Sequence, residues 1–252
     1  MKTTDFHDVL DEYRKPLLVT GAALALILAA LFSTDLRQTQ VTLTVPVPGS
    51  AVLVDNALHG TTNNPSQKVE LSLTPGLHMI LIAVDDRHPW TKEITLSPGE
   101  REELLVFNFP EKSFSEPVAS DHPAQSYTPS AEPIKEIVSA DGNVRLESDG
   151  GILRAHWIGD SSDMLSAFCF EGSCNETITI LESVRKIEDI GFLDTQGRIA
   201  LFVSSGNVYA LELNTEGTQN FQPIYVGTAP RLVPADDGIY VRDDGELRRI
   251  AL

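Results

Sequence analysis

Only two side chains in this sequence have both the type and the spacing for a definite chemistry. Cys169 and Cys174 are the only cysteines of the chain, and four residues separate them. A loop of this size can close as a disulfide in an oxidising compartment. Two cysteines without a third cysteine or a nearby histidine make only half a zinc site, and a C-x-x-C redox motif needs a different spacing. The pair therefore predicts a disulfide across the tip of a hairpin.

A catalytic arrangement cannot be recognised in the sequence. The six histidines are scattered, and the motifs of P-loop proteins, zinc proteases and α/β-hydrolases are absent. Acidic pairs at 85–86, 236–237 and 243–244 could form a calcium site or a carboxylate dyad. Their spacing does not fit a calcium loop, however, and aspartate is common in turns. We expect turns there, no catalytic, cofactor or metal residues, and no enzymatic activity.

Composition and charge exclude further classes. The 252 residues carry 19 Lys and Arg against 36 Asp and Glu, a formal net charge of -17. Nucleic-acid binding relies on clustered basic residues, so we expect no nucleic-acid partner. A hydrophobic fraction of 42% and a charged fraction of 22% exclude a collagen-like, fully disordered or multi-span membrane protein.

The most apolar segment lies near the N-terminus. Residues 16–34 carry no charge over 19 positions, enough for a helix of roughly 28 Å, close to the hydrocarbon thickness of a bilayer. The segment predicts an uncleaved transmembrane helix. A cleaved signal peptide is the alternative, although the exit of the segment lacks a clear cleavage site. Basic residues are concentrated in the arm, residues 1–15, so we expect a cytoplasmic N-terminus, a single-pass protein of the cell membrane and an extracytoplasmic bulk.

Residues 40–109 have the pattern of short strands. Apolar and polar residues alternate at 41–45 and 69–73, and Pro-Gly pairs at 75–76 and 98–99 mark turns. About six strands with such turns and no helical period favour a small β-sandwich.

Three short motifs in this region carry a resemblance. They are Pro48-Gly49-Ser50-Ala51-Val52-Leu53-Val54-Asp55, then Gly60-Thr61-Thr62, then Leu73-Thr74-Pro75-Gly76-Leu77-His78. In order and spacing they resemble the PEGA domain, through Pro48, Gly49, Ala51, Asp55, Gly60, Pro75, Gly76 and His78. Residues 85–90 depart from the Gly-Tyr pair usual in that family, and residues 61–65 from its compact Gly-Thr-Pro turn. The resemblance implies a binding or spacer module of a bacterial or archaeal cell envelope, with no catalytic residues.

The remaining chain divides into a spacer and a repeat. Residues 110–135 contain five prolines among polar residues and predict an extended linker. In 137–252, segments 142–158, 197–213 and 237–252 each have the pattern strand, Gly-containing turn, strand; segment 165–181 has the same outline. These hairpins resemble propeller blades. Four hairpins give only two four-stranded blades, whereas a closed propeller needs at least four blades. The domain could therefore be a truncated propeller, part of a propeller assembled from several chains, or a sandwich.

Taken together, the sequence predicts a mainly β chain with a single N-terminal transmembrane helix, a PEGA-like β-sandwich and a C-terminal all-β domain of propeller-like hairpins. The expected function is a non-enzymatic, membrane-anchored binding or scaffold protein of the cell envelope. Its partner would be a protein or glycan, and self-association into a homo-oligomer is compatible with the hairpin count. The alternative is a membrane-linked sensor or regulator that couples extracytoplasmic binding to a cytoplasmic partner.

Overall fold

The computed structural model describes residues 39–127, 132–170, 173–233 and 238–250. Strands dominate these residues, so the prediction of a mainly β chain is confirmed. The helical elements are three single turns of 3-10 helix: η1 (Pro123–Ser126), η2 (Ser161–Asp163) and η3 (Ser166–Phe168).

The predicted membrane anchor has to be corrected. In the part of the chain that the structure describes, no helix is long and apolar enough to cross a membrane. A crossing helix needs about 20 residues, whereas the helical turns found have three or four. Residues 16–34, on which the prediction rested, and the arm, residues 1–15, lie outside the described residues. The single transmembrane helix, the single-pass membrane localisation and the orientation derived from it are therefore not supported.

The chain divides into two compact units. Of the described residues, the smaller unit comprises 39–42, 70–77 and 95–103, and the larger unit comprises 43–69, 78–94 and the described part of the chain from 104 onward. In the smaller unit the Thr39 hydroxyl donates to the Leu73 carbonyl (2.9 Å), and the Gln40 amide donates to the Glu100 carbonyl (2.9 Å). The larger unit holds the cavities and polar clusters described below.

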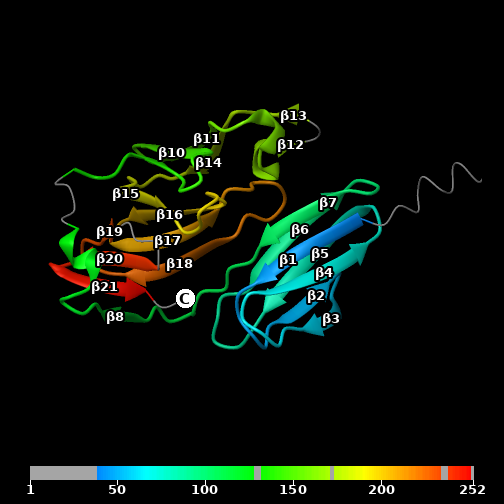
Figure 1. Cartoon of the computed structure of the whole chain (residues 1–252), viewed down its shortest axis with the longest axis horizontal. Helices are drawn as coiled ribbons and strands as arrows, with labels where there is room; N and C mark the ends of the chain where they lie inside the picture. The colour runs from blue at the N-terminus through cyan, green and yellow to red at the C-terminus, as the bar shows by residue number, and fades with distance from the viewer. Residues whose placement is uncertain (1–38, 128–131, 171–172, 234–237, 251–252) are drawn as a thin grey trace, which may run out of the picture. The chain divides into compact units, whose positions relative to one another are not determined.

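Seven strands form two sheets in the first part of the chain (Figure 1). One has the order β4-β1-β7 and the other β3-β2-β5-β6. In the second sheet apolar side chains alternate in burial: Val52, Val54, Ile80 and Ile82 are buried, and their strand neighbours are more exposed. The content is that of a β-sandwich, as the alternation predicted. The strands are β1 (Thr39–Val45), β2 (Ala51–Val54), β3 (Ala57–Thr61), β4 (Gln67–Leu73), β5 (Gly76–Ala83), β6 (Trp90–Leu96) and β7 (Arg101–Leu105).

Three four-stranded antiparallel sheets and one small hairpin follow. Sheet A has the order β14-β11-β10-β9, sheet B β15-β16-β17-β18, and sheet C β19-β20-β21-β8 (Figure 1). The hairpin β12–β13 is inserted between β11 and β14. The strands are β8 (Ser115–Pro117), β9 (Glu136–Val138), β10 (Val144–Asp149), β11 (Ile152–Trp157), β12 (Cys169–Phe170), β13 (Ser173–Cys174), β14 (Thr177–Glu182), β15 (Asp189–Phe192), β16 (Ile199–Ser204), β17 (Asn207–Glu212), β18 (Phe221–Val226), β19 (Arg231–Val233), β20 (Ile239–Asp243) and β21 (Glu246–Ile250).

The expected count of two blade-like sheets was too low. Segments 142–158, 197–213 and 237–252 correspond to the central hairpins of the three sheets, β10–β11, β16–β17 and β20–β21. Each hairpin gains a strand on either side. The segment 165–181 is different, because it holds the small hairpin and β14 rather than two strands of one four-stranded sheet.

The segment 110–135 is not simply an extended linker. Its strand β8 pairs with β21, with Ser115 opposite Ile250 and Pro117 opposite Arg248. The Arg248 guanidinium donates to the Ser115 hydroxyl (2.9 Å) and carbonyl (3.1 Å). Proline is compatible with this position because β8 is the edge of its sheet, where one side of the strand needs no N–H donor. The proline-rich segment therefore contains an edge strand that its composition did not predict.

Asp189 of β15 joins the three sheets. Its carboxylate is completely buried and accepts hydrogen bonds from the Ile134 amide (2.7 Å), the Leu232 amide (2.9 Å) and the Arg231 Nε (3.1 Å). Ile134 precedes β9 of sheet A, whereas Arg231 and Leu232 belong to β19 of sheet C. One carboxylate of sheet B thus binds donors from both other sheets.

A second buried polar cluster connects β6 with the hairpin β17–β18. Lys92 is fully buried, its ammonium lies 3.4 Å from the Glu212 carboxylate, and it donates to the Asn214 carbonyl (3.2 Å). The Asn220 side chain donates to Glu212 (2.8 Å) and to the Thr91 carbonyl (3.0 Å), and it accepts from the Thr91 amide (3.0 Å). All these residues belong to the larger unit.

Candidate ligand-binding cavity

The larger unit contains a cavity of about 450 Å³. Small-molecule sites typically measure about 300–1,000 Å³ and have mainly apolar walls with a few polar groups. This cavity has both properties. It is lined by residues 46–48 after β1, residues 105–109 at and after the end of β7, Arg87 between β5 and β6, Leu193 directly after β15, and Ile199 at the start of β16.

Hydrogen bonds from neighbouring segments hold the backbone of the cavity wall in place. The Val106 amide donates to the Thr44 carbonyl (3.1 Å). The side-chain amide of Gln222 accepts from the Phe109 amide (3.0 Å) and donates to the Phe107 carbonyl (3.0 Å). Because these backbone groups are satisfied in this way, the segment 105–109 can present mainly apolar side chains to the cavity.

Asn108 is the polar exception in that segment. Its side chain is buried, and its Nδ2 donates to the carbonyls of His88 (2.9 Å) and Ile82 (3.3 Å). Its Oδ1 is buried without a hydrogen-bond partner among the described residues. This oxygen has almost no solvent-accessible area, so it faces packed protein atoms rather than the open space of the cavity.

Arg87 is the only charged residue among those that line the cavity. Its Nη1 donates to the Asn108 carbonyl (2.8 Å), and its backbone forms an isolated bridge with Pro110. The contact places the guanidinium beside the residue that carries the unsatisfied acceptor. Arg87 and Asn108 are therefore neighbours among the mainly apolar residues that line the cavity.

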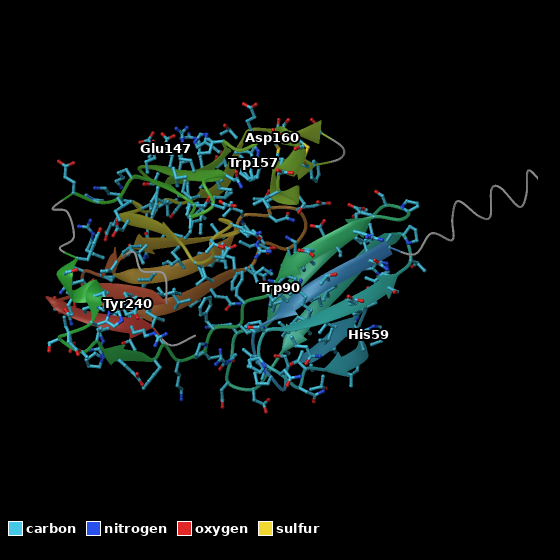
Figure 2. All side chains as sticks on the ribbon, in the orientation of Figure 1. His59, Trp90, Glu147, Trp157, Asp160 and Tyr240 are labelled. Carbon is cyan, nitrogen blue, oxygen red and sulfur yellow. A yellow bond between two sulfur atoms is a disulfide. The ribbon has the colours of Figure 1, made fainter. Side chains whose placement is uncertain are left out.

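A second cavity of about 210 Å³ lies where the three four-stranded sheets meet. Its wall comes from sheet A (Ile134, Ile137), sheet B (Ile190, Phe192) and sheet C (Tyr240, labelled in Figure 2), among others. This volume is below the usual range for small-molecule sites. We take the larger cavity as the candidate site.

The residues of the PEGA-like motifs mainly support turns. The Asp55 carboxylate lies 2.8 Å from the His78 Nδ1 and accepts from the Met79 amide (2.9 Å). The Met79 amide and then the His78 ring hold the pKa of Asp55 below its ordinary value. Asp55 and Gly49 have φ of 51° and 83°, the left-handed conformation that tight turns require. Of the motif residues, Pro48 alone is part of the cavity wall among the described residues.

The others have turn or strand positions. Ala51 begins β2, Gly60 lies in the exposed strand β3, and Gly76 begins β5 with a φ of 132° after Pro75. These positions fit the structural role that the resemblance implies, and they bring no set of polar side chains together.

Cys169 and Cys174, the pair for which the sequence predicted a disulfide, are bonded in the structure. They face each other in the register of β12 and β13. Phe168, directly before Cys169, is buried and packs edge-on against Trp157 (5.8 Å between ring centroids). The disulfide therefore closes an insertion whose base is fixed in the core.

Replacing both cysteines by serine should lower the free energy of unfolding by about 2 kcal/mol, because the disulfide restricts a short loop in the unfolded chain. Urea denaturation of the oxidised protein and of Cys169→Ser/Cys174→Ser measures the difference. A dithiol reductant should destabilise the wild type by a similar amount and leave the double variant unchanged. Equal midpoints for both proteins would contradict the prediction.

The structure places two of the described histidines beside hydroxyls, which the sequence did not reveal: His122 lies 3.3 Å from the Tyr240 hydroxyl, and His156 lies beside Thr177. The His156 Nδ1 lies 3.0 Å from the Thr177 hydroxyl, and its Nε2 lies 3.1 Å from the Glu147 carboxylate, which Figure 2 labels. A hydroxyl, an imidazole and a carboxylate in contact have the geometry of a nucleophile and its base. Yet Thr177 is exposed, and the three lie on neighbouring strands outside both cavities. We interpret them as cross-strand pairs on the face of sheet A.

Metal binding finds no support in the geometry. Within residues 39–250, apart from the three short gaps given above, no group of three or more histidines, cysteines and acidic residues is placed to hold a metal ion. Of the acidic pairs in the sequence, 236–237 lies outside the described residues. Asp243 accepts from the Tyr225 hydroxyl (3.0 Å) and from the amides of Thr228 and Ala229, so it supports a loop.

The sequence matches no protein-family model, and no curated protein is significantly similar to it. The resemblance to the PEGA domain therefore remains a prediction from three short motifs.

Proposed function

We propose that this chain is a non-enzymatic binding protein that holds an apolar ligand in the 450 Å³ cavity. The observation that carries the proposal is the combination of a cavity of ligand size and a largely apolar wall. Binding of an apolar molecule to such a wall is favourable, because it removes apolar surface of both the wall and the ligand from water. A protein or glycan partner and self-association stay predictions from the sequence.

The absence of enzymatic activity is part of the proposal. The Glu147–His156–Thr177 arrangement, the closest approach to catalytic geometry that we identify among the described residues, lies on a sheet face outside both cavities. The acidic side chains of Asp189 and Asp243 are engaged by backbone donors of neighbouring segments. Their roles are therefore explained by folding.

Substituting Val47 by tryptophan tests the cavity. Val47 lines the cavity, and its carbonyl, which accepts from the hydroxyls of Ser50 and Thr62, is unaffected by a change of side chain. An indole at this position would occupy the space of a ligand. We expect the wild type to bind the neutral fluorescent probe N-phenyl-1-naphthylamine at one site, and Val47→Trp to bind it about tenfold more weakly.

Val184→Trp is the matched control, since Val184 is fully exposed and does not line the cavity. It introduces the same side chain in the same chain and should leave the affinity for the probe unchanged. Circular dichroism of all three proteins shows whether they are folded. Folded wild-type protein that fails to bind the probe, or equal losses in both variants, would refute the proposed function.

A further inference from the structure

We infer that the ligand of this cavity is a hydrocarbon, either a free molecule or the hydrocarbon part of a larger one, and that no hydrogen-bonding group of the ligand enters the cavity. The inference rests on the proposed function and adds the chemical class of the ligand to it. The state of the polar groups in the wall carries it, because partners within the protein already engage them. Many apolar pockets instead orient their ligand through a few free polar groups.

Two polar side chains belong to the wall, those of Arg87 and Asn108. The Asn108 Nδ2 donates to the carbonyls of Ile82 (3.3 Å) and His88 (2.9 Å), and its Oδ1 has almost no accessible area. The Arg87 guanidinium donates to the Asn108 carbonyl (2.8 Å) and takes part in a further interaction. Both side chains therefore hold the wall together and do not anchor a ligand.

The wall segment after β1 has its carbonyls engaged as well. The Pro46 carbonyl accepts from the Ser66 amide (3.2 Å). The Val47 carbonyl accepts from two hydroxyls, those of Ser50 and Thr62 (both 2.8 Å). The segment also contains two prolines, and proline has no backbone N–H to donate. This side of the cavity therefore presents mainly carbon atoms to a ligand.

The wall segment after β7 has the same property. The Phe107 carbonyl and the Phe109 amide both bind the side-chain amide of Gln222 (3.0 Å each). The Phe109 carbonyl accepts from the His88 amide (2.9 Å). The rings of Phe107 and Phe109, 5.8 Å apart between their centroids, are the apolar groups of these residues. The polar groups are bound to protein, and the apolar groups remain for the cavity.

The wall at β15 and β16 completes the pattern. The Leu193 amide donates to the Ile199 carbonyl (3.0 Å), and the Ile199 amide donates to the Asp194 carboxylate (3.0 Å). A hydrogen-bonding group of a ligand would lose its bonds to water here and gain none from the engaged groups, which costs free energy. A hydrocarbon has no such cost, and burial of its surface is favourable.

The test compares rigid ligands of similar shape that differ in polarity. 2,6-Dimethylnaphthalene, 2,6-dihydroxynaphthalene and naphthalene-2,6-dicarboxylate compete for the bound naphthylamine probe. The two substituents lie at opposite ends of the ring system, so turning the molecule cannot bring both of them out of the cavity. With the wild type we expect the dimethyl compound to displace the probe at about hundredfold lower concentration than the dihydroxy compound, and the dicarboxylate to be the weakest competitor.

A hydroxyl added to the wall should reduce this selectivity. Val47→Thr introduces one at nearly constant side-chain size, and the hydroxyl can pair with a polar ligand. We expect the ratio between the dimethyl and dihydroxy compounds to fall about fivefold. Val226→Thr is the matched control, because Val226 is exposed in β18 and does not line the cavity. It should leave the ratio unchanged.

The hydrocarbon can come from two sources, a free molecule or the alkyl chain of an amphiphile. n-Decyl maltoside, kept below its critical micelle concentration, distinguishes them. Displacement of the probe at a concentration similar to that of 2,6-dimethylnaphthalene would identify an alkyl chain whose head group stays outside the cavity. Displacement only at about tenfold higher concentration or above would identify a free hydrocarbon.

The outcomes separate this inference from the proposed function. If the probe binds but the dihydroxy compound displaces it within about threefold of the dimethyl compound, the wall offers polar partners and the inferred class is wrong. The same conclusion follows if the dicarboxylate or an apolar peptide is the strongest competitor. If the probe itself does not bind, the proposed function fails first. The comparison of ligands needs only wild-type protein, so it holds even where Val47→Thr does not fold.

Discussion

Substituting Asp189 by asparagine is expected to destabilise the protein by about 3 kcal/mol, because the change removes a buried charge whose partners remain. The carboxylate is completely buried and accepts three hydrogen bonds, two from backbone amides and one from the guanidinium of Arg231. Asparagine keeps the size of the side chain but has one acceptor oxygen in place of two. Its NH₂ group would face a donor, and the guanidinium of Arg231 would lose its contact with a carboxylate.

The effect should extend beyond one sheet, since the donors lie in sheet C and in the segment that leads into sheet A. Hydrogen exchange measured on Asp189→Asn should show faster exchange at the Ile134 and Leu232 amides, which donate to the carboxylate in the wild type. Urea denaturation gives the loss in the free energy of unfolding. Asp149→Asn is the matched control: Asp149 is exposed at the end of β10, and such a change typically alters stability by less than about 0.5 kcal/mol. Equal midpoints for the two variants would contradict the role of Asp189.

Local signals explain which parts of the fold could be predicted. The three central hairpins have strands of five or six residues joined by Gly-containing turns, and each hairpin lies within about 17 residues of the chain. Gly206 and Gly245, in turns that belong to the predicted hairpins, have φ of 77° and 83° in the structure. Residues of this type determine turn geometry through their own backbone preferences, so a hairpin can be identified without its neighbours.

Three of the strands that the sequence did not reveal are very short, and one of these, β8, pairs with a distant partner. β8, β9 and β19 have three residues each, too few for a period to be visible. In β8, Ser115 pairs with Ile250, more than 130 positions away, and a proline within the strand indicates a linker when read locally. Such pairing depends on loop closure and on the complete sheet, neither of which a local pattern contains.

The cavity could be predicted only in part, for a related reason. Its wall combines residues 46–48, 105–109, Leu193 and Ile199, which are far apart in the chain. One local signal exists: Asn108 interrupts the apolar run of residues 104–109. A polar residue in such a run is either a buried structural group or part of a site, and only its hydrogen-bond partners separate the two. Asp189 and Lys92 gave no signal at all, because a single charge at the start or within a strand is indistinguishable from a surface residue.

Substituting Lys92 by methionine is the second change for which we expect a large loss, about 3 kcal/mol near neutral pH, because it leaves Glu212 buried without its cation. Lys92 is fully buried, and the side chain of Glu212 is 10% exposed. Nearby backbone packs too closely to rearrange easily: Gly217, in the loop between β17 and β18, has a φ of 61°, and a Cβ there would collide with the Glu93 carbonyl.

The loss should depend on pH, and its sign follows from the state of Glu212. Burial raises the pKa of Glu212 above its ordinary value of 4.5, against the opposing effects of Lys92 and Asn220. A carboxyl with a raised pKa in the folded state stabilises the fold fully below its unfolded pKa, and this contribution is lost as pH rises through the folded pKa. Removing Lys92 raises that pKa further. The destabilisation by Lys92→Met should therefore be small near pH 4.5 and grow toward neutral pH.

A double-mutant cycle measures the pair itself. Glu212→Gln removes the charge but keeps a side chain that can still accept from Asn220, so Lys92→Met/Glu212→Gln should recover about 2 kcal/mol of the loss near neutral pH. In the double variant the extra pH dependence should disappear, since the titrating group is gone. Lys68→Met, at an exposed position in β4, should alter stability by less than about 0.5 kcal/mol at either pH. Two results would contradict this prediction: a loss for Lys92→Met as small as that for Lys68→Met, or an equal loss at both pH values. Either result would mean that Glu212 is neutral or solvated in the folded protein. The cluster between β6 and the β17–β18 hairpin would then stabilise the fold through its amide hydrogen bonds alone.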